Sequence, residues 1–214
     1  PFGSRPSDEV AVPTLTELIR VEGRIDYQGP QDTPVRGLVL RGLTFTGGDR
    51  FPWHGRTGWG LQHDWECFDK PTALVRFRGA EQCAVEDCEF LQSGHTALRL
   101  DLHAQQIRVA GNHIHDIGGV GVLLAGYGPG TKDVNRQNKV VNNYIHDIGQ
   151  EYWGSGAIFA WQSGENQIAH NHIHSIPYTG ILATGRISRT PPGPGECSRT
   201  IRWEETTEAF RQWS

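Results

Sequence analysis

One short pattern recurs in the middle of the chain and constrains the fold more than any other feature. An asparagine is followed, after one residue, by isoleucine, then histidine, then aspartate or serine. Each copy has an aliphatic residue three positions before its asparagine. The three copies are NHIHD (112–116), NYIHD (143–147) and NHIHS (171–175).

Two further segments fit the same frame. CAVEDCEF (83–90) places Cys88 at the asparagine position and Phe90 at the isoleucine position, and GLVLRGLTF (37–45) fits more weakly. Successive asparagine positions are 45, 24, 31 and 28 residues apart, which leaves a unit of about two dozen residues once loops are subtracted. A unit of that size is typical of one turn of a β-solenoid.

The alternation within each copy indicates which side chains face inward. On a strand, Asn112 and Ile114 face one way while His113 and His115 face the other. Stacked coils would therefore hold an interior column of asparagines that bond to one another, which satisfies buried amides. The sequence predicts an all-β, right-handed parallel β-helix with long inserted loops and irregular or helical ends. An antiparallel sandwich is the alternative, but it would show hairpin signals rather than one recurring template.

The repeats also set the expected domain limits. We expect the β-helix domain to span residues 34–186, with an inserted loop at 46–71. Residues 1–33 are predicted to flank it and to hold a short helix at 15–20. Residues 187–214 are predicted to be irregular or helical and to continue into further coils.

Composition excludes several classes of function. The 214 residues carry a net charge of −4 without an evident basic patch, so no nucleic-acid partner is expected. No apolar run approaches the roughly 18 residues of a membrane span, so no membrane partner is expected. The chain starts without Met, from which we expect a processed form or a piece of a longer protein.

The second strand of each repeat offers outward residues suited to a sugar. In TALRLDLH (96–103), Arg99, Asp101 and His103 share the outer face, and neighbouring coils present aromatic and aliphatic residues there. Flat rings stack on pyranoses and fixed charges read hydroxyls, so we predict a polysaccharide or oligosaccharide substrate. The alternative is an Arg99–Asp101 surface ion pair that contributes little. The predicted substrate contacts are Arg99, His103, Trp161, Phe159, Trp65 and His63.

Two carboxylates are predicted to carry the chemistry. Asp101 should stay ionised beside Arg99, which suits a base or nucleophile. Glu151 lies in the inserted turn QEYW (150–153), where apolar neighbours would raise its pKa toward that of a general acid. Asp147 is the reserve candidate. A hydrolase would hold the pair about 5–10 Å apart across a groove.

Metal and thiol chemistry receive less support. The H-x-H pairs at 113–115 and 172–174 can chelate zinc on a strand, but no carboxylate or cysteine was found within the same strand column. We therefore expect no metal ligands and no cofactor, with structural calcium as the one cation left open. The four cysteines form no C-x-x-C pair and are expected to be buried free thiols.

The run GAEQCAVEDCEF…NHIHDIGGVGVLLAGYGPG…NNYIHDIG…GENQIAHNHIHSIPYTGI resembles the right-handed parallel β-helix repeat superfamily of carbohydrate-active enzymes. Within it the chain looks most like glycoside hydrolase family 141, whose members act on plant-wall xylan or fucosylated pectic glycans. That resemblance, over about residues 35–186, implies a hydrolase that works outside the cytoplasm, secreted or periplasmic. The N-T-D, D-D and G-H-G motifs of galacturonase-type relatives are missing, and S-G-H at 93–95 stands alone. A uronate lyase using Arg99 and His103, or a non-catalytic glycan-binding or structural solenoid, are the alternatives.

Overall fold

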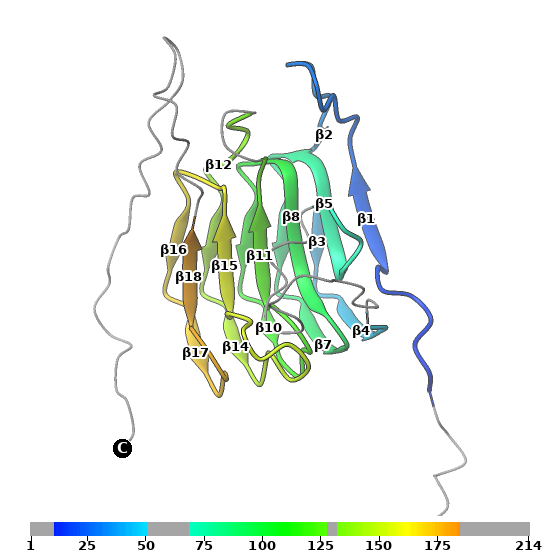
Figure 1. Cartoon of the computed structure of the whole chain (residues 1–214), viewed down its shortest axis with the longest axis vertical. Coiled ribbons are helices and arrows are strands. Elements are labelled where there is room, and N and C mark those ends of the chain that lie inside the picture. Colours follow the sequence, from blue (N-terminus) through cyan, green and yellow to red (C-terminus); the bar gives the residue numbers. More distant parts are fainter. Residues whose placement is uncertain (1–10, 51–68, 128–131, 185–214) are drawn as a thin grey trace, which may run out of the picture.

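The named strands of this protein all pair in parallel and follow one another around three sheets. A computed structural model describes residues 11–50, 69–127 and 132–184, and Figure 1 shows a stack of coils that runs from β1 at one end to β18 at the other. Within these residues the chain passes repeatedly through three parallel sheets in the same order, and we call them sheets I, II and III. This winding confirms the predicted parallel β-helix.

Each sheet collects one strand or more from every coil. Sheet I contains β1 (Ile19–Glu22), β2 (Val35–Arg36), β5 (Ala73–Glu81), β8 (Thr96–Gln105), β11 (Val122–Ala125), β12 (Asn135–Arg136), β15 (Ile158–Trp161) and β18 (Ile181–Thr184). Sheet II contains β3 (Val39–Arg41), β6 (Ala84–Glu86), β9 (Arg108–Ala110), β13 (Lys139–Val141) and β16 (Gln167–Ala169). Sheet III contains β4 (Thr44–Gly48), β7 (Glu89–Ser93), β10 (His113–Ile114), β14 (Tyr144–His146) and β17 (His172–His174).

The predicted asparagine column lies at the corner between sheets II and III. The backbone N–H and Nδ2 of Asn112 both donate to Asn143 Oδ1, at 3.1 and 2.9 Å. Asn143 makes the same two bonds to Asn171 Oδ1, at 3.0 and 2.9 Å. Cys88, at the asparagine position of the preceding coil, donates its backbone N–H to Asn112 Oδ1 at 3.0 Å. The amides thus satisfy the backbone at a buried corner, as the repeat predicted.

The register of sheet III places the apolar positions of the repeat in one interior column. Phe90 aligns with Phe45 on one side and Ile114 on the other, and the column continues through Ile145 to Ile173. The rings of Phe45 and Phe90 stack with centroids 5.0 Å apart. Burial of this column against the facing strands of sheet I supplies the hydrophobic stabilisation of the stack.

Residues with positive φ mark the corners of every coil. Before sheet II these are Gly37, Gln82, Gln106, Gln137 and Glu165. Between sheets II and III they are Gly42, Asp87, Gly111, Asn142 and His170. The four side chains that follow Gly37 before sheet II form an exposed ladder of hydrogen bonds. Gln82 donates to Gln106, Gln106 to Gln137 and Gln137 to Glu165, at 3.3, 3.3 and 2.8 Å. Those bonds offset part of the roughly 1–2 kcal/mol that a left-handed residue costs.

Three expectations about the flanks need correction or lie outside the described residues. The predicted helix at 15–20 is wrong, because Leu18 donates to Leu74 O at 2.9 Å and β1 then pairs with β5. Alternating Ile19 and Val21 pack inward, so pairing in sheet I outweighs local helix preference. Sheet I therefore begins before the predicted limit at residue 34, and β4 occupies the start of the predicted 46–71 loop. The segment 187–214 lies outside the described residues. No helix in the described part of the chain is long and apolar enough to cross a membrane.

Candidate functional site: two outer faces of the coil stack

The outer face of sheet I changes from charged to apolar along the stack. Register places Arg76 beside Arg99, then Leu123, Phe159 and Leu182 in the following coils. Leu123, Phe159 and Leu182 match the aromatic and aliphatic neighbours expected from the repeat, whereas Arg76 was not predicted. Leu123 and Phe159 are buried, and Trp161 and Leu182 pack against them while staying half-buried. Predicted contacts Trp65 and His63 lie outside the described residues.

Arg99 and Asp101 form a buried ionic network rather than a surface pair. Both residues are 0% exposed, and Arg99 contacts Asp101 through Nε at 3.1 Å and Nη2 at 2.9 Å. Arg76 donates from Nε to the same carboxylate at 2.6 Å and from Nη2 to Asp69 at 2.5 Å. Burial opposes ionisation of Asp69, but Arg78 and Arg76 outweigh it and lower the pKa of that carboxyl. Removing one member of such a network would leave a buried charge uncompensated. The network therefore has a structural role on this face.

His103 belongs to a second network at the end of β8. Its Nδ1 lies 2.9 Å from Asp32 Oδ2 and its Nε2 lies 2.8 Å from Glu81 Oε1. Lys132 donates to the other oxygen of Asp32 at 2.7 Å. Burial raises the pKa of Asp32, yet Lys132 and His103 together bring it below its ordinary value. His103 therefore ties the segment around Asp32 to sheet I.

The structure does not bring Asp101 and Glu151 into contact. Asp101 lies in the middle of β8, whereas Glu151 lies in the turn before β15, where its N–H donates to Gly118 O at 2.9 Å. The Glu151 side chain is 50% exposed and lies 3.5 Å from Arg50 Nη1. Of this predicted pair, only Glu151 is accessible. Asp147, the reserve candidate, is 49% exposed and four residues from Glu151 on the same turn.

The outer face of sheet III carries two stacked rows of rings, which we call the ring ladder. The rows are His113, Tyr144 and His172, and His115, His146 and His174. Within the second row, centroids lie 5.3 and 4.9 Å apart and ring planes are within 9° and 2° of parallel. Because the ring faces cover one another, His115 and His146 are only 15% and 16% exposed.

Carboxylates and a serine fix the orientation of the second row. His115 Nδ1 lies 2.8 Å from Asp116 Oδ2, His146 Nδ1 lies 2.7 Å from Asp147 Oδ2, and His174 Nδ1 lies 2.9 Å from Ser175 Oγ. The bond from His115 lowers the pKa of Asp116. In the first row, burial and then repulsion from His115 and His146 lower the pKa of His113. The second row is therefore held in a fixed orientation, and the surroundings of His113 favour its neutral form.

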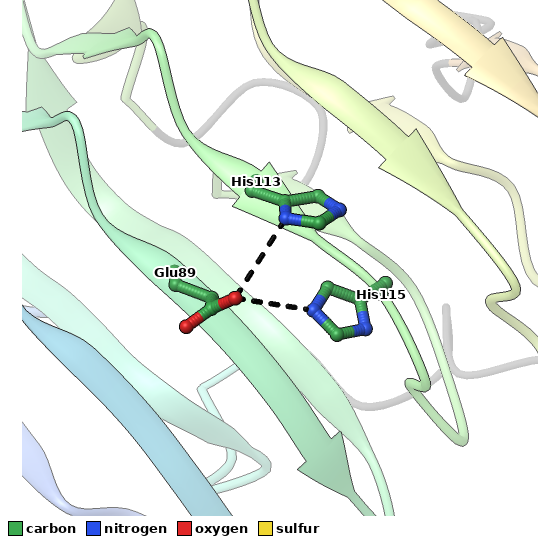
Figure 2. A group of neighbouring side chains, drawn as sticks. All are labelled: Glu89, His113 and His115. Carbon is green, nitrogen blue, oxygen red and sulfur yellow. Dashed lines mark hydrogen bonds and ion pairs between the residues drawn. The ribbon is translucent and has the colours of Figure 1, made fainter.

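A carboxylate adjoins the ladder at its first coil. Glu89 aligns with His113 in sheet III, and its Oε1 lies 3.7 Å from His113 Nδ1 and 3.5 Å from His115 Nε2 (Figure 2). These three ligand atoms all lie within 4.8 Å of one another. Glu89 lies on the neighbouring coil and not within a histidine strand, so the H-x-H pattern alone does not predict it. The signal was present in CAVEDCEF, where Glu89 occupies the position of His113 in the frame.

A comparison with protein-family models matches residues 72–190 to the right handed beta helix region. This chain belongs to the right-handed β-helix family. The family description supplies the handedness predicted from the repeat, and it agrees with the three parallel sheets. Searches of the curated proteins and of the solved structures found no match. Members of the β-helix family share an architecture whose outer faces vary, so function must be argued from the faces of this β-helix.

Proposed function

We propose that this β-helix protein binds an extended polysaccharide along sheet III and belongs among the carbohydrate-active proteins of its fold. The observation that carries the proposal is the ring ladder with its neighbouring carboxylates. Tyr144 is 38% exposed and the Glu89, Asp116 and Asp147 side chains are between 41% and 52% exposed, whereas Arg99, Asp101 and Phe159 on sheet I are at most 3% exposed. Of these two faces, sheet III with its edge therefore carries the accessible acidic and aromatic groups.

The ladder suits a polymer of hydroxyl-bearing units. The Tyr144 hydroxyl, which lies 2.8 Å from His174 Nε2, keeps a lone pair, and the exposed carboxylates beside the ladder accept hydrogen bonds from sugar hydroxyls. Neighbouring rings of one row are 4.9–5.3 Å apart, close to the length of one sugar residue in an extended glycan. Because the rings are held by strand pairing and by one another, little side-chain entropy is lost on binding.

We further propose that the protein hydrolyses the glycan that it binds. Asp147 and Glu151 share one exposed turn, and Asp116 joins them through Gln150, whose Nε2 donates to Asp116 Oδ1 at 3.3 Å and to Asp147 O at 3.1 Å. Two accessible carboxylates at the border of sheet III meet the chemical need of a glycoside hydrolase. The likeness to glycoside hydrolase family 141 supports xylan or pectic glycans as substrates. We extend the proposal to a secreted or periplasmic location, where such polymers occur.

Binding is tested by affinity electrophoresis in gels that contain xylan, pectin, homogalacturonan or cellulose. We expect retardation by at least one polymer. Tyr144→Ala should weaken that binding by about tenfold, about 1.4 kcal/mol, while Lys139→Ala, on sheet II of the same coil, should not change it. Migration unaffected by every polymer would contradict the proposed binding, as would equal retardation of wild type and Tyr144→Ala.

Catalysis is tested on the retained polymer by two readouts in parallel. Release of reducing ends without new absorbance from unsaturated uronates indicates hydrolysis, and the absorbance band indicates the lyase alternative. Glu151→Gln and Asp147→Asn should each reduce hydrolysis at least a hundredfold while polymer retention is kept. Retention of the polymer with neither product would refute hydrolysis and favour the non-catalytic binding module.

A further inference from the structure

We propose that Glu89, His113 and His115 form a site for a divalent transition-metal ion, for which Zn²⁺ is the natural probe. The ligand atoms are Glu89 Oε1, His113 Nδ1 and His115 Nε2 (Figure 2). This inference is independent of glycan binding, and it departs from the sequence-based expectation of no metal ligands.

Hydrogen bonding assigns the proton of each imidazole. Asp116 accepts from His115 Nδ1, which leaves the lone pair on His115 Nε2. Asp147 accepts from His146 Nδ1 in the same way, so His146 Nε2 accepts the proton of His113 Nε2 at 2.9 Å. The lone pair of His113 is therefore on Nδ1.

Two imidazole nitrogens and a carboxylate oxygen consequently lie within 4.8 Å of one another. The Glu89 oxygen lies 3.7 Å from His113 Nδ1 and 3.5 Å from His115 Nε2, and the second contact is a long hydrogen bond when Nε2 carries a proton. Three acceptors facing one another repel unless a cation lies among them. The arrangement therefore needs a metal ion, or a second proton on an imidazole.

The two distances from Glu89 fit a tetrahedral ion. Bonds of about 2.0–2.2 Å to a tetrahedral Zn²⁺ place its ligands about 3.3–3.6 Å apart. The two Glu89 distances of 3.5 and 3.7 Å differ from that by a few tenths of an ångström at most. Two nitrogens and one oxygen favour zinc and its neighbours over calcium and magnesium, which prefer oxygen alone.

The groups behind the ligands complete the site. Asp116 holds His115, His146 holds His113, and Thr44 Oγ1 donates to the second oxygen of Glu89 at 3.3 Å. Such partners orient metal ligands and raise their basicity. Glu89 and His113 have side chains 41% and 40% exposed, so a fourth position faces solvent and is available to water or a substrate oxygen.

The test is calorimetric titration with Zn²⁺ of chain purified without a histidine tag and stripped with a chelator. Glu89→Gln and His115→Ala should each weaken one Zn²⁺ site at least tenfold, and Asp116→Ala about tenfold. The matched controls are Glu165→Gln, on the exposed side-chain ladder before sheet II, and His172→Ala, two coils along the ring ladder; neither should change the affinity. Circular dichroism of the metal-free variants checks that each one folds. If His115→Ala does not fold, Glu89→Gln still decides the test, because glutamine has nearly the same shape as glutamate.

Two results would overturn the proposal. One is Zn²⁺ affinity that Glu89→Gln leaves unchanged, or no binding at all. The other comes from imidazole ¹⁵N chemical shifts recorded before and after addition of Zn²⁺. We expect the resonances of His115 Nε2 and His113 Nδ1 to shift on metal binding, whereas unchanged shifts at these two nitrogens would show that the ion binds elsewhere.

Discussion

Replacement of Asn143 by alanine tests whether the asparagine column stabilises the fold. The side chain is 1% exposed and takes part in five hydrogen bonds. Its oxygen accepts from the backbone N–H and the amide of Asn112, and its Nδ2 donates to Val109 O, Val141 O and Asn171 Oδ1.

The expected magnitude follows from which partners are left unsatisfied. In the variant, the Asn112 amide keeps its hydrogen bond to Val85 O at 3.0 Å. Asn171 Oδ1 keeps its hydrogen bond from the backbone N–H of residue 143 at 3.0 Å. The Asn112 backbone N–H has no second acceptor among the described residues, and an orphaned buried donor costs about 1–3 kcal/mol. With the net loss of the remaining bonds, we expect Asn143→Ala to lower the free energy of unfolding by about 2–4 kcal/mol.

Equilibrium urea unfolding followed by circular dichroism measures this loss. With a slope of about 2 kcal/mol per molar urea, the middle of the usual range, the midpoint should fall by roughly 1–2 M. Asn142→Gly is the control, because Asn142 is exposed with a φ of 55° that glycine adopts readily, and it should change stability by about 0.5 kcal/mol or less. A loss below about 1 kcal/mol for Asn143→Ala would refute the column as a source of stability.

Three further predictions concern stability. Ile145→Ala, at 0% exposure in the interior column, should cost about 2–5 kcal/mol in urea unfolding, and a cost below 1 kcal/mol would contradict tight packing there. Asp101→Asn should cost about 3–5 kcal/mol because Arg76 and Arg99 lose their buried counter-charge, whereas the exposed Glu151→Gln should cost less than about 0.5 kcal/mol; equal effects would refute the buried network. The pKa of Asp69 is lower in the folded chain than in the unfolded one, so its stabilisation is complete above the unfolded pKa of about 3.9 and disappears as pH falls through the folded value. Asp69→Asn should therefore flatten the loss of stability below about pH 4, and an unchanged acid profile would contradict the pairing with Arg78 and Arg76.

The comparison of sequence and structure separates two kinds of information. The period of the repeat was enough to predict the parallel coils, the asparagine column and the aromatic and aliphatic residues that neighbouring coils place beside Arg99. Each of these depends on local alternation and on one coil stacking in register on the next, and both are encoded in a few residues. The predicted helix at 15–20 was wrong because pairing with β5, far along the chain, decides the conformation there.

The accessibility of a side chain was decided only by tertiary structure. Strand alternation correctly predicted that Arg99 and Asp101 point outward. Arg76 and Asp69 form an ionic network with them, so they are buried and do not line an open groove. Likewise Glu89 reaches His113 and His115 only because sheet III aligns two coils. Sequence determines the face toward which a side chain points, since that follows from strand geometry. What covers or contacts it on that face depends on segments distant in the chain, and their positions follow from packing as a whole.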